Sequence, residues 1–138
     1  MKKIIALVLV AVLAFAFIGC AKTADNGEDA LKIGVILVGD ENEGYTYAHI
    51  EGIKGAMANL GITNDQVIWK YTIPEDETCY DTAVDLAEQG CSIIFSNSYS
   101  HQSYMVQAAE EYPDVTFCPA AGDTAAVCGL DNVINFFP

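Results

Sequence analysis

Residues 31–38, with the sequence LKIGVILV, decide the fold of this chain. The run is apolar almost throughout and does not alternate, which is typical of a β-strand buried on both faces of a parallel sheet. A helical pattern follows over residues 45–60, where apolar side chains recur every three or four positions and Gly61 marks the end. A buried strand followed by an amphipathic helix is the beginning of a βαβ unit.

The rest of the chain repeats this alternation. Amphipathic patterns predict further helices over residues 77–89 and 101–112. Short apolar runs predict further strands over residues 66–73, 91–96, 115–120 and 132–136. Strands that alternate with helices of this length form right-handed βαβ units. We therefore predict an α/β fold, in which a parallel sheet carries helices on both of its faces.

The N-terminal segment, residues 1–19, has the features of a secretory signal. Two lysines precede fifteen apolar residues, a run shorter than the roughly twenty residues of a membrane span. The run ends in the sequence FIGC, which resembles a bacterial lipoprotein processing site. This resemblance implies that Cys20 becomes the lipidated first residue of the mature chain. An ordinary signal followed by a chance cysteine is the alternative.

A domain organisation follows from the lipoprotein interpretation. Residues 20–30 are small and polar, and we expect them to tether the lipid to the domain. Residues 31–138 are the domain itself. The acyl chains would hold it on the extracytoplasmic face of the cell membrane. The chain stops directly after the predicted fifth strand, without a helix to cover it, so we expect a truncated N-terminal part of a longer protein.

The chain is strongly acidic. Nineteen Asp and Glu residues stand against six Lys and no Arg, which gives a formal net charge of −13. A nucleic-acid partner is disfavoured, because phosphate neutralisation needs clustered Lys and Arg. Anionic ligands are disfavoured for the same reason, except where a helix N-terminus binds them.

The cysteines after Cys20 do not form an evident disulfide framework. Cys79 and Cys91 are expected near opposite ends of one helix, too far apart to bridge. The sequence leaves open whether Cys118 and Cys128 form a disulfide. The sequence has no C-x-x-C spacing, so we predict neither a zinc site nor a cofactor.

The first candidate ligand loop follows the first strand. In open α/β sheets ligands bind beyond the carboxyl ends of the strands, where the strand order reverses; for the order 2-1-3-4-5 this point lies between the first and third strands. This loop supplies Asp40, Glu43, Gly44, Tyr45 and Thr46. Tyr45 is expected either to stack on a planar ligand or to pack inward as a hydrophobic staple. Thr46 is either a ligand contact or the helix N-cap.

The second candidate loop follows the third strand. It contains Asn97, Ser98, Tyr99 and Ser100, four residues that can hydrogen-bond a polar ligand. Turn chemistry also favours Asn and Ser, so a purely structural role is the alternative.

Three segments together resemble a known family. They are IGVILVGDENEGYTYAHIEGIKGA near the N-terminus, AEQGCSIIFSNSYSHQSYMVQAAEEYPDVTF in the middle and NVINFF at the end. Their order and spacing are similar to the basic membrane protein family of ABC-transporter substrate-binding lipoproteins. The stretch from Gly44 to His49 is the most specific part, and the resemblance covers residues 31–138.

The resemblance implies a fold and a function. Members of the family have two flavodoxin-like lobes of the type I periplasmic-binding-protein fold, which close on the ligand like a hinge. This chain matches only the first lobe. The family implies a purine nucleoside or a similar small polar solute as the ligand, and an ABC permease and ATPase as partners. The chain lacks the Asp-Lys-Ser-Phe-Asn motif of one group of members; Tyr45 and Thr46 fall near its Phe and Asn.

Three other interpretations remain open. A calcium loop would use Asp40, Asn42 and Glu51 as ligands. The motif does not match, because Gly44 and Tyr45 stand where it needs an oxygen ligand and then a glycine. A hydrolase would need His49 or His101 as a catalytic residue, yet no catalytic motif accompanies either of them. If the protein is not a hydrolase, we expect His49 to be a packing residue. We expect His101 to lie near the crevice, where it either touches the ligand or faces solvent. A membrane-tethered sensor would share the fold and the pocket, so the sequence does not separate it from a transport receptor. We predict binding without catalysis.

Overall fold

The computed structural model describes residues 31–137, and the predicted signal, Cys20 and the tether lie outside these residues. The first half of the described part contains β1 (Ile33–Ile36), α2 (Gly44–Leu60), η1 (Asn64–Gln66), β2 (Val67–Lys70) and α3 (Glu77–Glu88). The second half contains β3 (Ile93–Ser96), η2 (Tyr99–His101), α4 (Gln102–Glu111), β4 (Thr116–Pro119) and α5 (Thr124–Val127).

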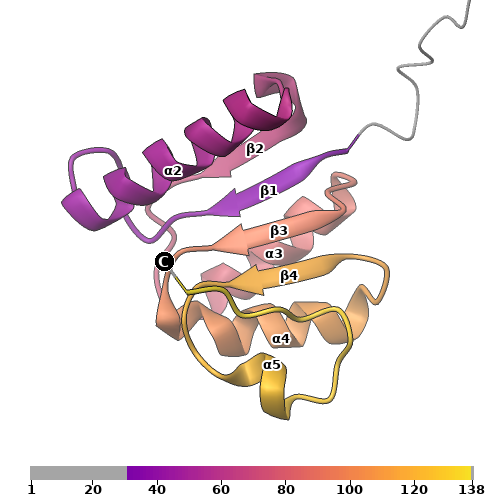
Figure 1. The fold of residues 1–138 in the computed structure, drawn as a ribbon. Helices are drawn as coiled ribbons and strands as arrows, with labels where there is room; N and C mark the ends of the chain where they lie inside the picture. Colours follow the sequence, from indigo (N-terminus) through magenta and orange to yellow (C-terminus); the bar gives the residue numbers. More distant parts are fainter. Residues whose placement is uncertain (1–30, 138) are drawn as a thin grey trace, which may run out of the picture. The chain divides into compact units, whose positions relative to one another are not determined.

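The four strands form one parallel sheet in the order β2-β1-β3-β4 (Figure 1). Ile33 of β1 lies opposite Val67 of β2 on one side and Ile93 of β3 on the other. Because β1 is flanked by strands on both sides, it is buried along its whole length, as its uninterrupted apolar sequence predicts. The predicted α/β fold with a parallel sheet is confirmed.

The predicted fifth strand does not form a regular strand. Residues 132–136 run parallel to β4 but meet it through two isolated bridges, Phe117 with Val133 and Ala120 with Phe136. Between them the Asn135 side chain donates to the carbonyl of Ala121 and accepts from the N–H of Ala125. These side-chain bonds tie the segment to the α5 region. The ladder with β4 is interrupted at Pro119, which has no N–H to donate to the segment.

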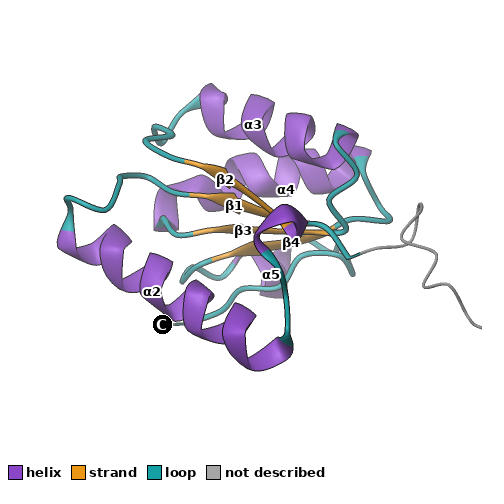
Figure 2. Ribbon diagram, turned by 90° about the horizontal axis from the view of Figure 1, so that it is seen from above, coloured by secondary structure: helices purple, strands orange, loops and turns teal. Residues whose placement is uncertain are grey.

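Helices cover the two faces of the sheet unequally. Helices α3 and α4 pack side by side on one face, and α2 lies on the other (Figure 2). The α3 and α4 face holds a core of twelve buried residues, whereas the α2 face holds six. Close approach of α3 depends on Gly34, where an added Cβ would lie 2.9 Å from Leu86 Cδ1.

The predicted ends of the helices agree with the structure to within a few residues. The capping residues explain where the helices begin and end. Gly61 ends α2 in the left-handed conformation at φ 70°, as its position in the sequence predicts. Asp76 caps α3 by accepting a hydrogen bond from the N–H of Thr78. The single-turn helix α5 was not predicted from any sequence pattern.

Two further observations concern the described residues. Cys118 and Cys128 are free thiols, as are Cys79 and Cys91, so the disulfide left open above is absent from the structure.

Between residues 31 and 137, no helix has the length and apolar character needed to cross a bilayer.

Candidate functional site

The two candidate loops meet at one edge of the sheet. Strands β1 and β3 are neighbours, and the chain leaves both at their carboxyl ends toward α2 and η2 (Figure 1). This is the strand-order reversal at which parallel sheets bind ligands, because β1 connects outward to β2 and the chain then crosses back to β3. The two candidate loops therefore lie together at the edge of the sheet where the sequence predicts a ligand crevice.

Asn97 joins the two sides of the crevice. Its side chain is only 2% exposed. Its Oδ1 accepts a hydrogen bond from the Val38 N–H at 2.8 Å, and its Nδ2 donates to Thr46 Oγ1 at 3.3 Å. Both ends of the amide are thus used inside the protein, where they hold the end of β1 against the first turn of α2.

Glu43 caps α2, so the alternative role of Thr46 as the N-cap is not adopted. The Glu43 carboxylate accepts from the N–H groups of Tyr45 and Thr46, both at 2.7 Å. The Thr46 N–H, followed by that of Tyr45, lowers the pKa of this carboxyl. Thr46 is fully buried under Gly39, where an added Cβ would come within 2.9 Å of its hydroxyl. Gly44 starts the helix and is exposed.

Tyr45 stands at the rim of the crevice. Its ring is 46% exposed, and its hydroxyl donates to the Asn97 carbonyl at 2.5 Å, so the inward-packed alternative is not adopted. The ring meets His49 edge-on, with centroids 4.6 Å apart, and His49 in turn faces Phe136 at 6.5 Å. The hydroxyl bond fixes the ring across the end of β3 while leaving one side available to solvent.

The second loop is folded back on the sheet. Ser98 is buried, and its hydroxyl donates to Glu75, a contact that the sequence did not reveal. The same oxygen accepts from the Ser100 N–H at 3.2 Å, which starts η2. Tyr99, by contrast, is 60% exposed. Of this loop, Tyr99 alone presents a large side chain to solvent.

His101 differs from both expectations, because it neither faces solvent nor reaches the crevice. Its side chain is fully buried, and Nε2 lies 3.2 Å from the carbonyl oxygen of Ile73, to which it donates. Burial lowers its pKa, so the ring is neutral near pH 7. Its Nδ1 and the hydroxyl of Ser96 have no hydrogen-bond partner. The turn of η2 carries the ring beneath the loop and into the core.

The loops of the crevice carry carboxylates, and no lysine side chain of the described part of the chain pairs with them. Asp40 is half-buried and accepts from the Asn42 N–H at 2.9 Å. The described lysines are occupied elsewhere: Lys54 pairs with Glu51, Lys70 pairs with Asp85, and Lys32 donates to the carbonyl of Gln89. No cluster of three metal-binding side chains occurs among residues 31–137. Glu51, which the calcium-loop alternative would use as a ligand, lies within α2.

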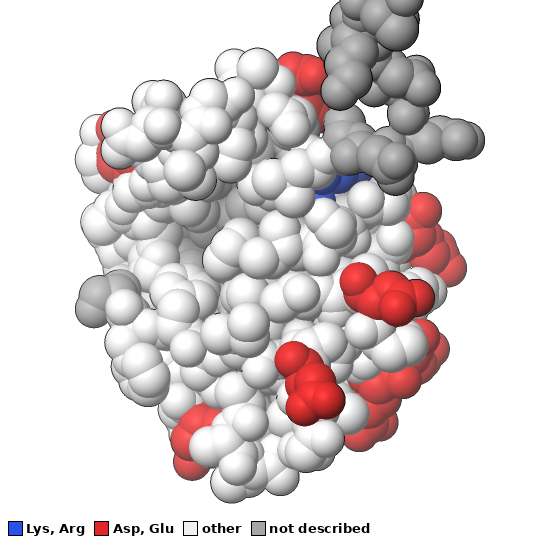
Figure 3. Space-filling view, turned by 45° about the vertical axis from the view of Figure 1, so that its right-hand side comes forward, with Lys and Arg blue, Asp and Glu red and all other residues white. Residues whose placement is uncertain are grey.

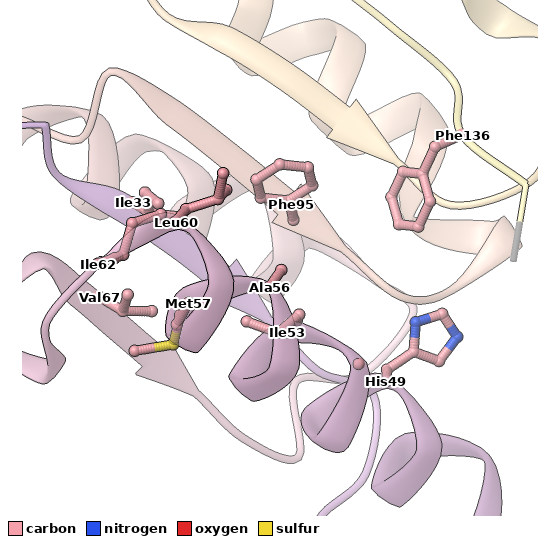
Figure 4. A pocket seen from close by; sticks show the side chains of 11 residues that line it. Ile33, His49, Ile53, Ala56, Met57, Leu60, Ile62, Val67, Phe95 and Phe136 are labelled. Atoms are coloured by element: carbon pink, nitrogen blue, oxygen red, sulfur yellow. The ribbon is translucent and has the colours of Figure 1, made fainter.

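A separate apolar groove of about 260 Å³ lies on the α2 face of the sheet. In Figure 4, side chains of α2 line one wall, and Phe95 and Phe136 lie across from them. His49 stands at the end nearest Phe136 and links the groove to the Tyr45 ring described above. Its pKa is lowered by burial.

Comparisons with known proteins identify the fold. The sequence matches no family model and no curated protein. Solved structures do match. A solute-binding protein of an ABC transporter system from Conexibacter woesei superposes with a TM-score of 0.65 and 21% identity, over 78% of this chain and 35% of that one.

Two transcription regulators share the same architecture. One is a transcriptional activator of the comK gene from Bacillus halodurans, with a TM-score of 0.61 and 21% identity over 75% of this chain and 33% of that one. The other is a putative transcription regulator from Staphylococcus saprophyticus, with a TM-score of 0.58 and 15% identity over 76% and 43%. The chain thus has a periplasmic-binding-protein fold and spans about a third to two-fifths of these structures.

Proposed function

We propose that this protein is an extracytoplasmic solute-binding lipoprotein that delivers a small polar solute to an ABC importer. The observation that carries the proposal is the meeting of the two candidate loops at the strand-order reversal, with the fixed and half-exposed Tyr45 ring beside them. The superposition on a solute-binding protein of an ABC transporter supports it through the shared fold. The resemblance of the sequence to the basic membrane protein family points to a purine nucleoside.

The proposed mechanism is capture without chemistry. Tyr45 stacks on the planar ring of the solute, and Asp40 and Tyr99 supply hydrogen bonds at the rim. Asn97 and Ser98 act mainly as supports, since their side chains are engaged with Thr46, Val38 and Glu75. The remainder of a two-lobed receptor would close over this edge, and the ABC permease and ATPase would receive the closed form.

Calorimetric titration of the complete receptor with adenosine tests the stacking. Tyr45→Ala should weaken binding about two- to tenfold, the equivalent of the 0.5–1.5 kcal/mol that aromatic pairs add beyond burial. Tyr47→Ala is the matched control, because Tyr47 is a similarly exposed tyrosine of α2 without a hydrogen bond to the crevice loops. Equal affinities of the Tyr45 variant and the wild type would refute stacking, and absence of binding by the wild type would refute the nucleoside.

The lipid anchor has an independent test. Radioactive palmitate should label the wild type and not Cys20→Ser in the native host, since Cys20 is the proposed acylation site. Label on the Cys20 variant would contradict the lipoprotein assignment.

A membrane-tethered ligand sensor is the second candidate. The two transcription regulators with the same fold favour it, because they place this architecture in regulatory proteins. Deletion of the gene for this protein separates the two functions: loss of a transport receptor abolishes solute uptake, whereas loss of a sensor leaves uptake intact and abolishes the transcriptional response to the solute.

A further inference from the structure

Two side chains join the loop between β2 and α3 to the second candidate loop. His101 Nε2 donates to the carbonyl oxygen of Ile73 at 3.2 Å, and the Ser98 hydroxyl donates to the Glu75 carboxylate. The first of these bonds is buried in the core, whereas the second lies toward the surface. The two loops are therefore held together at the carboxyl edge of the sheet, and His101 is the buried part of the connection.

The surroundings of the His101 ring suit its neutral form alone. Because Nε2 donates to Ile73, Nδ1 carries the lone pair, and no protein group donates to it. The Ser96 hydroxyl, at the end of β3, is also buried and likewise has no protein partner. Within residues 31–137 the ring thus finds one acceptor, the Ile73 carbonyl, and none for a second N–H.

We propose that the contact between His101 and Ile73 is acid-sensitive, and that protonation of the ring releases the second candidate loop from the β2–α3 loop. The protonated ring gains an N–H at Nδ1 that has no acceptor, and it places a full charge in a side chain with no exposed surface. Both costs disappear when the ring leaves the core. This behaviour belongs to the folded domain and does not depend on the proposed transport function.

The charged groups around the ring do not reverse this preference. Glu75 is the carboxylate whose charge favours protonation of His101, but it is exposed, so solvent screens it. Asp76, at the N-terminus of α3, and Asp123, beside the start of α4, are exposed as well. Burial raises the pKa of the Cys79 thiol to about 12, which keeps this α3 side chain neutral. Strand β3, η2 and the first two turns of α4 contain no Asp, Glu or Lys.

The remaining carboxylates of the described residues are also in contact with water. All of them are exposed except Asp40, which is half-buried in the first candidate loop. The space-filling view shows acidic side chains standing on the surface (Figure 3). A protonated His101 therefore finds no buried counter-ion among residues 31–137.

The pH window follows from the direction of the pKa shift. Burial lowers the pKa of His101 below its ordinary value of 6.5, and the bond to Ile73 and the charge of Glu75 offset this only in part. A ring released into water regains the ordinary value. The open loop then binds a proton that the closed loop does not, so the closed loop loses stability as the pH falls from about 6.5 toward the folded pKa. Above that window the contact is at full strength.

Hydrogen–deuterium exchange of the complete protein at pH 7 and pH 5, corrected for the intrinsic exchange rates, tests the proposal. The N–H groups of Ser100 and His101 report on the loop, because both donate to Ser98 in the closed form. Relative to amides of α3, we expect their opening constant to increase about tenfold in the wild type, as uptake of one proton below pH 6.5 allows.

Two variants identify the titrating group. His101→Gln keeps an N–H donor for the Ile73 carbonyl but does not titrate, so its opening constant should change less than about twofold between the two pH values. His49→Gln is the matched control, because it removes the second of the two histidines of the chain and should behave as the wild type.

Three results would overturn the proposal. The first is a change below about twofold in the wild type, and the second is an equal increase in the wild type and His101→Gln, because another group then titrates. The third is a response that His49→Gln abolishes. An NMR titration of the His101 ring in the wild type needs no variant: a folded pKa below 6.5 supports the proposal, and a folded pKa at or above 6.5 contradicts it.

Discussion

Replacing Asn97 with alanine should remove the link between the two sides of the crevice. The change leaves the Val38 N–H without its 2.8 Å acceptor and Thr46 Oγ1 without its 3.3 Å donor. An unsatisfied buried donor costs about 1–3 kcal/mol, and a lost hydrogen bond about 0.5–1.5 kcal/mol. We therefore expect a decrease of about 2–4 kcal/mol in the free energy of unfolding, out of the roughly 5–15 kcal/mol typical of a domain.

Urea denaturation followed by circular dichroism measures this decrease. Asn42→Ala is the control, because the Asn42 amide also donates one side-chain hydrogen bond, at 3.1 Å to Asp40, but in an exposed loop. We expect the control to change stability by less than about 0.5 kcal/mol. A loss of similarly small size for Asn97→Ala would refute the conclusion that its amide holds β1 against α2. That result would return Asn97 to the ligand-binding role expected from the sequence.

Three further outcomes follow from the packing and the pKa shifts. Gly34→Ala should destabilise the protein by about 1–3 kcal/mol, measured by urea denaturation, because its Cβ would lie 2.9 Å from Leu86 Cδ1. The Glu43 carboxyl has a folded pKa below its ordinary value of 4.5, so its stabilising effect is present above that pH and is lost as the pH falls through the folded value. The difference in unfolding free energy between the wild type and Glu43→Gln should accordingly be constant near neutral pH and shrink below about pH 4.5. Burial raises the pKa of the Cys79 thiol to about 12, so iodoacetamide at pH 8 should alkylate the half-buried Cys128 long before Cys79, as read by peptide mass spectrometry.

The layered architecture could be predicted from the sequence because it depends on periodicity. The uninterrupted apolar run of β1 can be satisfied only between two other strands, and the helical spacing over residues 45–60 leaves few alternatives to α2. The meeting of the two candidate loops follows from the strand order, so it too was predictable. The fifth segment is not a regular strand because Pro119 of β4 has no N–H to donate to it, which leaves only two isolated bridges.

The roles of single polar residues were less predictable, since they depend on local turn geometry. Thr46 is a good N-cap by type, yet the helix begins two residues before it and Glu43 takes the capping role. His101 follows a polar loop, and only the turn of η2 directs its ring into the core. The partnership of Ser98 with Glu75 joins residues 23 positions apart, which no local pattern records.

The unequal filling of the two faces of the sheet has a consequence for how the molecule comes apart. Since the α2 side buries six core residues against twelve on the α3 and α4 side, α2 is the element that local opening should release first. Amide protons of α2 would then exchange with deuterium sooner than those of α3. Such opening uncovers Val35 and Leu37, which belong to the apolar run of residues 31–38. The domain therefore holds an aggregation-prone strand beneath the more thinly packed face of its sheet, and storage conditions that keep α2 in place should govern its shelf life.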